Sequence, residues 1–122
     1  MSEAGPRPDE VRLNRAEHSL KLIYADGRTF ALPAEYLRVH SPSAEVKGHG
    51  GGPRRTVAGK RNVAIERVEP VGNYAIKPVF SDGHETGIFT WSYLFELGVD
   101  FDRNWQSYLD RLEKEGLSRD PS

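Results

Sequence analysis

The fold is decided by the stretch Ser19–Leu32, which reads SLKLIYADGRTFAL. The dipeptide Asp26-Gly27 lies between two strand-like runs, and glycine tolerates the positive φ that a two-residue hairpin turn demands. Apolar side chains recur at every second position on the two sides of this turn: Leu20, Leu22, Tyr24, Phe30 and Leu32. Because a period of two places side chains on one face of a strand, the stretch predicts a β-hairpin with one buried face.

The same pattern returns 56 residues later, where Asp82-Gly83 follows the strand-like run Tyr74–Phe80 and precedes the return run Glu85–Phe89. Pro78 cannot donate a ladder hydrogen bond, so we expect this strand to lie at a sheet edge at that point. A short helical segment follows each hairpin. The sequence therefore predicts two β-hairpin-plus-short-helix units.

Three segments predict helices. Proline suits the first turn of a helix, which favours a helix over Pro33–His40. A second helix is predicted over Trp91–Leu97, stopped by Gly98, and a third over Arg103–Glu115 with Asp102 as its N-cap. We expect an α+β fold: an antiparallel sheet built from the two hairpin-plus-helix units, with the C-terminal helix packed on the sheet.

The two ends of the chain and one internal segment offer little to a core. Residues 1–17 hold two prolines and dense charge and predict a flexible N-terminal arm, and residues 117–122 predict a tail. Residues 47–61, KGHGGGPRRTVAGKR, hold five glycines and five basic residues and predict a flexible basic loop. The single domain is expected over residues 18–116.

Composition excludes several classes of function. The 122 residues suit one domain, and 17 basic against 18 acidic residues give a net charge of −1, which argues against a nucleic-acid partner. The absence of cysteine removes disulfides, thiolate zinc sites, iron–sulfur ligation and cysteine nucleophiles. No apolar run of about 18 residues is present, so we expect no membrane association and a cytoplasmic location.

Candidate catalytic and metal-binding sets are weak. No histidine is followed two positions later by an acidic residue, the pair that usually opens a non-haem iron site. A zinc site could draw on four residues without tight ligand spacing: His40, Glu45, His49 and His84. A hydrolase triad could draw on Ser92, His84 and Asp82, but no nucleophile-elbow motif surrounds the serine. We therefore expect no catalytic residue and no cofactor.

The basic loop invites a phosphate-binding interpretation. A P-loop would need glycine where Arg54 stands and serine or threonine where Arg61 stands, so that pattern fails. The loop is either merely solvated or contacts an anionic partner through its basic side chains: Arg54, Arg55, Lys60 and Arg61. Aromatic residues also crowd the C-terminal half, where they indicate core packing or, on an edge, a protein-docking surface.

Two motifs carry a family resemblance. They are Glu69–Tyr74, EPVGNY, and Asp82–Ile88, DGHETGI, followed by Trp91, Tyr93 and Leu94. Together with Leu22–Gly50 they resemble the N-terminal domain family of γ-butyrobetaine hydroxylase in its free-standing bacterial form, a domain of unknown function.

The resemblance implies a scaffold without the family's chemistry. In the eukaryotic hydroxylases this domain precedes the oxygenase domain and holds a structural zinc through three cysteines and one histidine. The histidine matches His84, and the cysteines would fall near Ser41, Ser43 and Val46, which cannot replace thiolates. The domain is also similar to a module appended to P-loop iron–sulfur carriers of the Mrp type, which implies a role near iron–sulfur assembly.

We expect a non-catalytic interaction module with a protein partner, accessory to an oxygenase or to iron–sulfur protein assembly. The alternative is a metal- or small-ligand-binding domain centred on His84. The candidate binding residues are His84, Trp91, Tyr93, Asn73, Tyr74, Arg54 and Arg55, with His84 as the one weak metal candidate.

Overall fold

The structure, a computed structural model, describes residues 6–42 and 56–121. Within these residues the elements follow in the order β1 (Glu10–Asn14), β2 (Ser19–Ile23), β3 (Thr29–Pro33), α1 (Ala34–Val39), β4 (Ile65–Val71), β5 (Ala75–Phe80), β6 (Phe89–Thr90), α2 (Trp91–Val99) and α3 (Phe101–Glu115).

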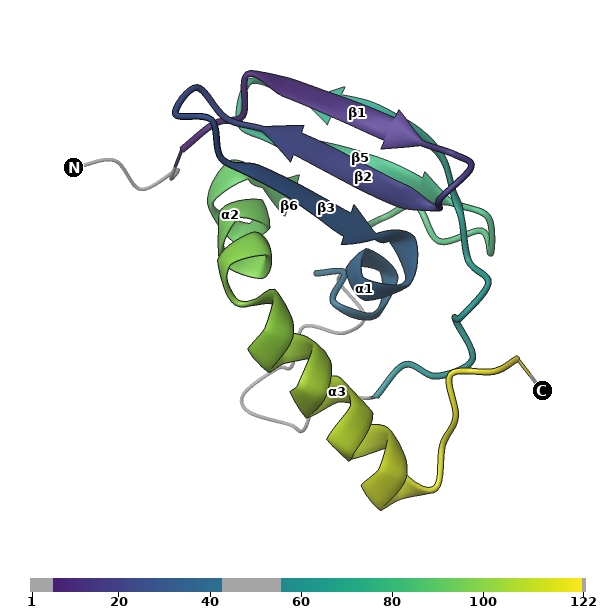
Figure 1. The fold of residues 1–122 in the computed structure, drawn as a ribbon. Helices are drawn as coiled ribbons and strands as arrows, with labels where there is room; N and C mark the ends of the chain where they lie inside the picture. Colours follow the sequence, from purple (N-terminus) through teal and green to yellow (C-terminus); the bar gives the residue numbers. More distant parts are fainter. Residues whose placement is uncertain (1–5, 43–55, 122) are drawn as a thin grey trace, which may run out of the picture.

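The strands form two antiparallel three-stranded sheets, β1-β2-β3 and β4-β5-β6. In Figure 1 the second sheet lies behind the first, and the three helices lie together below them. The expected α+β class with helices packed on antiparallel strands is confirmed. The strands divide between two sheets, and each sheet holds one expected hairpin and a third strand, β1 or β4.

Both Asp-Gly turns form as the sequence predicts. Gly27 and Gly83 adopt φ values of +90° and +92°, which explains why glycine occupies both positions. In each turn the aspartate side chain accepts a hydrogen bond from the backbone N–H two residues later, at 2.9 Å for Asp26 and 3.1 Å for Asp82. The two turns therefore share one local design.

The return strand of the second hairpin is shorter than expected. The prediction of Glu85–Phe89 is wrong in extent, because β6 spans two residues and pairs only with Ala75 and Ile76 of β5. Pro78 pairs with Val68 of β4 and has no strand on its other side within the described residues. The missing proline N–H thus falls where β5 has one ladder partner, as expected.

Large apolar side chains from both sheets and all three helices form the core. It includes Leu20, Leu22, Leu32, Tyr36, Leu37, Ile65, Phe80, Phe89, Leu94 and Tyr108. Each such side chain contributes about 1.5 to 3 kcal/mol when buried. The hydroxyls of Tyr36 and Tyr108 donate to the carbonyls of Leu97 at 2.7 Å and Val57 at 2.6 Å. Of the aromatic residues in the C-terminal half, Phe80, Phe89, Trp91 and Tyr108 are buried.

The prediction of an N-terminal arm over residues 1–17 is wrong for the part that forms β1. Residues 10–14 pair with β2 along its whole length, from Glu10 opposite Ile23 to Asn14 opposite Ser19. Their exposure alternates between exposed and half-buried. Composition could not predict this strand, because backbone pairing with β2, rather than a fully buried side chain, holds it in place.

The C-terminal tail and the end of the basic loop also pack. The N–H groups of Gly59 and Arg61 donate to the carbonyls of Ser118 and Arg119, each at 2.9 Å. Arg119 also forms a two-bond ion pair with the buried carboxylate of Glu35, at 2.7 and 2.8 Å. Residues 56–61 and 117–121 therefore form a paired strap, and the remainder of the expected loop, 47–55, lies outside the described residues.

Two helix boundaries differ from the predictions, whereas α1 lies within the expected range. Gly98 does not stop α2, which continues to Val99. A Cβ at Gly98 would lie 2.3 Å from a ring carbon of Phe30, so glycine is needed there for close packing. Asp102 is not the N-cap of α3, because the helix already begins at Phe101 after Asp100.

The longest helix of the described residues, α3, has 15 residues. Within residues 6–42 and 56–121, no helix combines the length and the apolar character needed to cross a membrane.

Candidate functional site

The turn between β4 and β5 presents an aromatic side chain on a fixed backbone. Tyr74 is 51% exposed although it lies beside the core. The indole Nε1 of Trp91 donates to the carbonyl of Asn73 at 2.8 Å, and the Trp91 backbone N–H donates to the carbonyl of Tyr74 at 3.2 Å. The first residue of α2 therefore holds the turn at two successive carbonyls.

Trp91 is itself held by its surroundings. It is buried, and the guanidinium of Arg7 lies 5.6 Å from the centroid of its ring. The preceding residue, Thr90, is the N-cap of α2, and its hydroxyl accepts from the N–H of Tyr93 at 3.1 Å. These contacts fix the start of the helix and, through Trp91, the turn that carries Tyr74.

His84 lies in the second Asp-Gly turn and contacts the end of α1. Its Nε2 shares a hydrogen bond with the hydroxyl of Ser41 at 2.9 Å. Ser41 is only 6% exposed, and a Cβ at Gly87 would lie 1.9 Å from its hydroxyl oxygen. The hydroxyl is therefore enclosed between the histidine and the glycine.

A second side chain holds the same end of α1. The Tyr93 hydroxyl donates to the carbonyl of His40 at 2.5 Å. The Nδ1 of His40 lies 2.9 Å from the carbonyl of Tyr36, so this nitrogen carries a proton and donates. The last turn of α1 and the residue after it are thus joined to α2 and to the His84 turn.

Asp82 forms a charge cluster beside His84. Its carboxylate accepts from Arg38 at 2.8 Å and from Lys60 at 2.6 Å. Burial alone would raise the pKa of Asp82, but the hydrogen bonds from Lys60, from the backbone N–H of His84 and from Arg38 outweigh it and lower the pKa to about 2. The carboxylate is therefore ionised at any ordinary pH and joins three separate segments.

The structure gathers the predicted site residues into two groups, one beside the start of β5 and one beyond its end. Asn73 and Tyr74 lie against Trp91, whereas His84 and Tyr93 both contact the end of α1. Trp91 and Tyr93, both in the first turn of α2, link the groups. Arg54 and Arg55 lie outside the described residues.

Sequence reasoning missed the cations around Asp82. Arg38 and Lys60 are 44 and 22 positions away in the chain, and nothing in their local sequence marks them as its partners. The repeated Asp-Gly pair did mark Asp82 itself. Ser41 was marked only through the family resemblance.

The sequence profile of the family described as "Gamma-butyrobetaine hydroxylase-like, N-terminal" matches residues 11–95. The chain belongs to this family. A comparison with curated proteins gives no match.

Three solved structures are similar to the family member described above. One solution NMR structure is 48% identical, with a TM-score of 0.84, covering 96% of this chain and 92% of the other. A second is 40% identical, with a TM-score of 0.83 and coverage of 99% and 90%. A crystal structure of a protein of unknown function from Acidithiobacillus ferrooxidans, of the DUF971 family, is 40% identical, with a TM-score of 0.66 and coverage of 80% and 98%.

The described residues do not fit the zinc site that the resemblance implies. At the matching positions, Ser41 and His84 supply one hydroxyl and one imidazole, and these two groups hydrogen-bond to each other. Within the described part of the chain, no three His, Asp or Glu side chains gather into a set that could hold a metal. Ser43 and Val46, the other two matching positions, lie outside it.

Proposed function

We propose that this family member is a non-catalytic interaction module that docks a protein partner through what we call the turn face. The turn face consists of the β4–β5 turn, residues 72–74, which precedes β5, and the His84 turn, residues 82–88, which connects the end of β5 to β6. The observation that carries the proposal is the 51% exposed ring of Tyr74 on a backbone that Trp91 fixes at two carbonyls.

A fixed, exposed aromatic suits binding. Tyrosine is enriched among the residues that dominate interface energies, because it buries a large area at a small cost in side-chain entropy. The pinned turn has little backbone freedom left to lose on association. Ile88, 40% exposed in the His84 turn, adds apolar surface. The partner that fits this face presents an apolar pocket for the Tyr74 ring.

Contacts of the polar groups support a role without catalysis. A serine nucleophile must reach its substrate, but Ser41, which contacts the His84 imidazole, is enclosed. The family resemblance leads us to expect an oxygenase or an iron–sulfur assembly factor as the partner.

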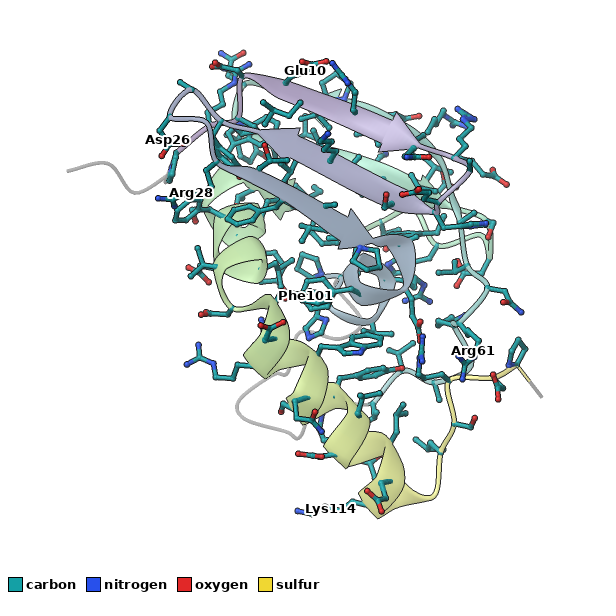
Figure 2. The ribbon with its side chains drawn as sticks, in the orientation of Figure 1. Glu10, Asp26, Arg28, Arg61, Phe101 and Lys114 are labelled. Carbon is teal, nitrogen blue, oxygen red and sulfur yellow. The ribbon has the colours of Figure 1, made fainter. Side chains whose placement is uncertain are left out.

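Charge steering by the basic loop finds no support in the described residues of the loop. Lys60 is paired with Asp82, and Arg61 is paired with Asp120. The arrangement beside the C-terminal segment is visible in Figure 2, where Arg61 is labelled. The proposal therefore rests on the aromatic turn rather than on the loop.

The test is quantitative affinity capture from native lysate with the full chain and three variants. Tyr74→Ala removes the ring, Tyr74→Phe keeps it, and Leu117→Ala alters another exposed apolar side chain, 41% exposed, beyond the C-terminal end of α3. Thermal melting of each variant checks that the fold is unchanged.

We expect a reproducible partner that the wild type, Tyr74→Phe and Leu117→Ala retain and that Tyr74→Ala loses. A partner captured equally by Tyr74→Ala would show that the turn face is not the docking surface. Recovery of no reproducible partner, or turnover of a substrate by the purified chain, would contradict the proposed function itself.

A further inference from the structure

The first sheet ends in an open edge. Its strand order is β1-β2-β3, so β3 has β2 on one side and no strand on the other within residues 6–42 and 56–121. Such an edge presents unpaired backbone groups and is a template for another strand. Figure 1 shows this edge of β3 turned toward α2 and α3.

The hydrogen-bond register identifies the residues that face outward. Two backbone bonds bracket the β2–β3 ladder: Tyr24 N–H to the Arg28 carbonyl at 2.9 Å, and Ala34 N–H to the His18 carbonyl at 2.7 Å. Because hydrogen-bonded pairs alternate along an antiparallel ladder, Phe30 and Leu32 bond toward β2. Thr29 and Ala31 therefore direct their N–H and carbonyl groups toward the open edge.

A shallow groove of about 280 Å³ runs along the same edge. Residues 29–32 form one wall, and the junction of α2 and α3 forms the other. Val99, on the second wall, is 55% exposed. Phe101, labelled in Figure 2, lies at this junction. An extended chain laid along β3 would thus meet apolar side chains on the side facing the helices.

The groove also carries an unbalanced charge. Asp102 lines it, and no ion pair of Asp102 occurs within the described residues, whereas the neighbouring Asp100 pairs with Arg103 at 2.9 Å. A basic side chain at the same groove would complement this carboxylate.

We propose that the β3 edge is a second docking site, which binds an extended segment of a partner protein as a fourth strand of the first sheet. Main-chain hydrogen bonds to Thr29 and Ala31 supply affinity, and alternate side chains of the segment enter the groove. The segment carries an aliphatic side chain to meet Val99 and a lysine or arginine to meet Asp102. Pro33, which has no N–H, limits the docked strand at one end.

The probe for this site is the peptide acetyl-Thr-Val-Thr-Lys-Thr-amide, in which valine and lysine share one face of a strand. The control peptide replaces lysine with glutamate and is otherwise identical. Amide exchange of the full ¹⁵N-labelled chain is followed by NMR at millimolar peptide. We expect exchange at Thr29 and Ala31 to slow at least tenfold with the lysine peptide and less than twofold with the control.

Two variants and their control complete the test. Ala31→Pro removes an outward N–H group but no hydrogen bond between β2 and β3, so we expect it to abolish the slowing of amide exchange by the lysine peptide. Ala31→Val keeps the N–H group, and we expect the slowing to remain. Asp102 lies on an exposed helical surface, and we expect Asp102→Lys to weaken peptide binding at least tenfold. This variant tests the site even if the protein does not tolerate proline at position 31. Tyr74→Ala leaves peptide binding unchanged, so this site and the turn face are tested separately.

Lack of protection at Thr29 and Ala31 with the lysine peptide would overturn the inference. Equal binding by Asp102→Lys would do the same. Protection of both amides in the free protein, together with a dimer in sedimentation, would assign the edge to a second copy of the chain and overturn the partner assignment.

Discussion

Replacing Asp82 with asparagine tests the charge cluster that joins α1, the residues before β4 and the second hairpin. Burial opposes ionisation of this carboxyl, but its hydrogen bonds from Lys60, the His84 N–H and Arg38 lower its pKa from 3.8 to about 2. A shift of this size corresponds to about 2 kcal/mol of folding free energy for a side chain that is 21% exposed.

The sign of the pH dependence follows from the depressed pKa. Stability from Asp82 is fully present above the unfolded-state value of 3.8 and is lost as the pH falls toward about 2. Asp82→Asn therefore lowers the free energy of unfolding by about 2 kcal/mol at pH 7, and its difference from the wild type shrinks between pH 4 and pH 2.

The assay is urea unfolding, followed by circular dichroism, at a series of pH values from 7 to 2. Asp26→Asn is the matched control, because Asp26 has the same place in the first turn but is 61% exposed and lies 3.6 Å from Arg28. Its expected effect is below about 0.5 kcal/mol at every pH. Equal effects of the two substitutions, or a difference for Asp82→Asn that does not change with pH, would refute the reasoning.

Three further predictions concern packing. The buried Tyr24 hydroxyl has no hydrogen-bond partner in the described structure, so we expect Tyr24→Phe to raise the free energy of unfolding by about 1 kcal/mol. Tyr36→Phe loses the hydrogen bond to the Leu97 carbonyl, so we expect it to lower the free energy of unfolding by a similar amount in the same urea assay. Changes of the same sign in the two variants would contradict this prediction. Gly98→Ala forces a methyl against the Phe30 ring and lowers stability by about 1 to 3 kcal/mol, and an unchanged urea midpoint would contradict the close packing. Deletion of residues 1–17 removes β1 and lowers the melting temperature by several degrees in calorimetry; an unchanged value would mean that β1 contributes nothing.

Local sequence signals were enough for the two Asp-Gly turns and for the presence of the three helices. The dipeptides Asp26-Gly27 and Asp82-Gly83 fixed both turns, because their φ values and side-chain hydrogen bonds depend on residues next to one another. The period of two in β2 identified its buried face. The motifs around residues 69–74 and 82–88 identified the family.

Features that depend on distant partners could not be predicted. β1 has no fully buried residue, so only its pairing with β2 reveals it as a strand. From the sequence, Gly98 is typical of a residue that ends a helix. In the structure its lack of a Cβ instead allows the Phe30 ring to pack closely against α2. The two residues of the Glu35–Arg119 ion pair are 84 positions apart, and no local sequence pattern predicts their contact.

The candidate site shows the same division. The family motifs identified Tyr74, Trp91 and His84 as candidates. Only the fold shows that Trp91 hydrogen-bonds to the turn that carries Tyr74 and that Ser41 hydrogen-bonds to the His84 imidazole. The histidine that the resemblance matches to a zinc ligand thus hydrogen-bonds here to Ser41, just beyond the end of α1. This contact preserves the arrangement of the α1 end and the second hairpin.

The central claim is that the pinned Tyr74 ring is the anchor of a protein interface. Its most direct test is titration calorimetry of the purified partner against wild type, Tyr74→Ala, Tyr74→Phe and Leu117→Ala. We predict that Tyr74→Ala weakens binding about 30-fold, which corresponds to about 2 kcal/mol, while the other two variants bind within about twofold of wild type. An affinity for Tyr74→Ala equal to that of the wild type would contradict the claim.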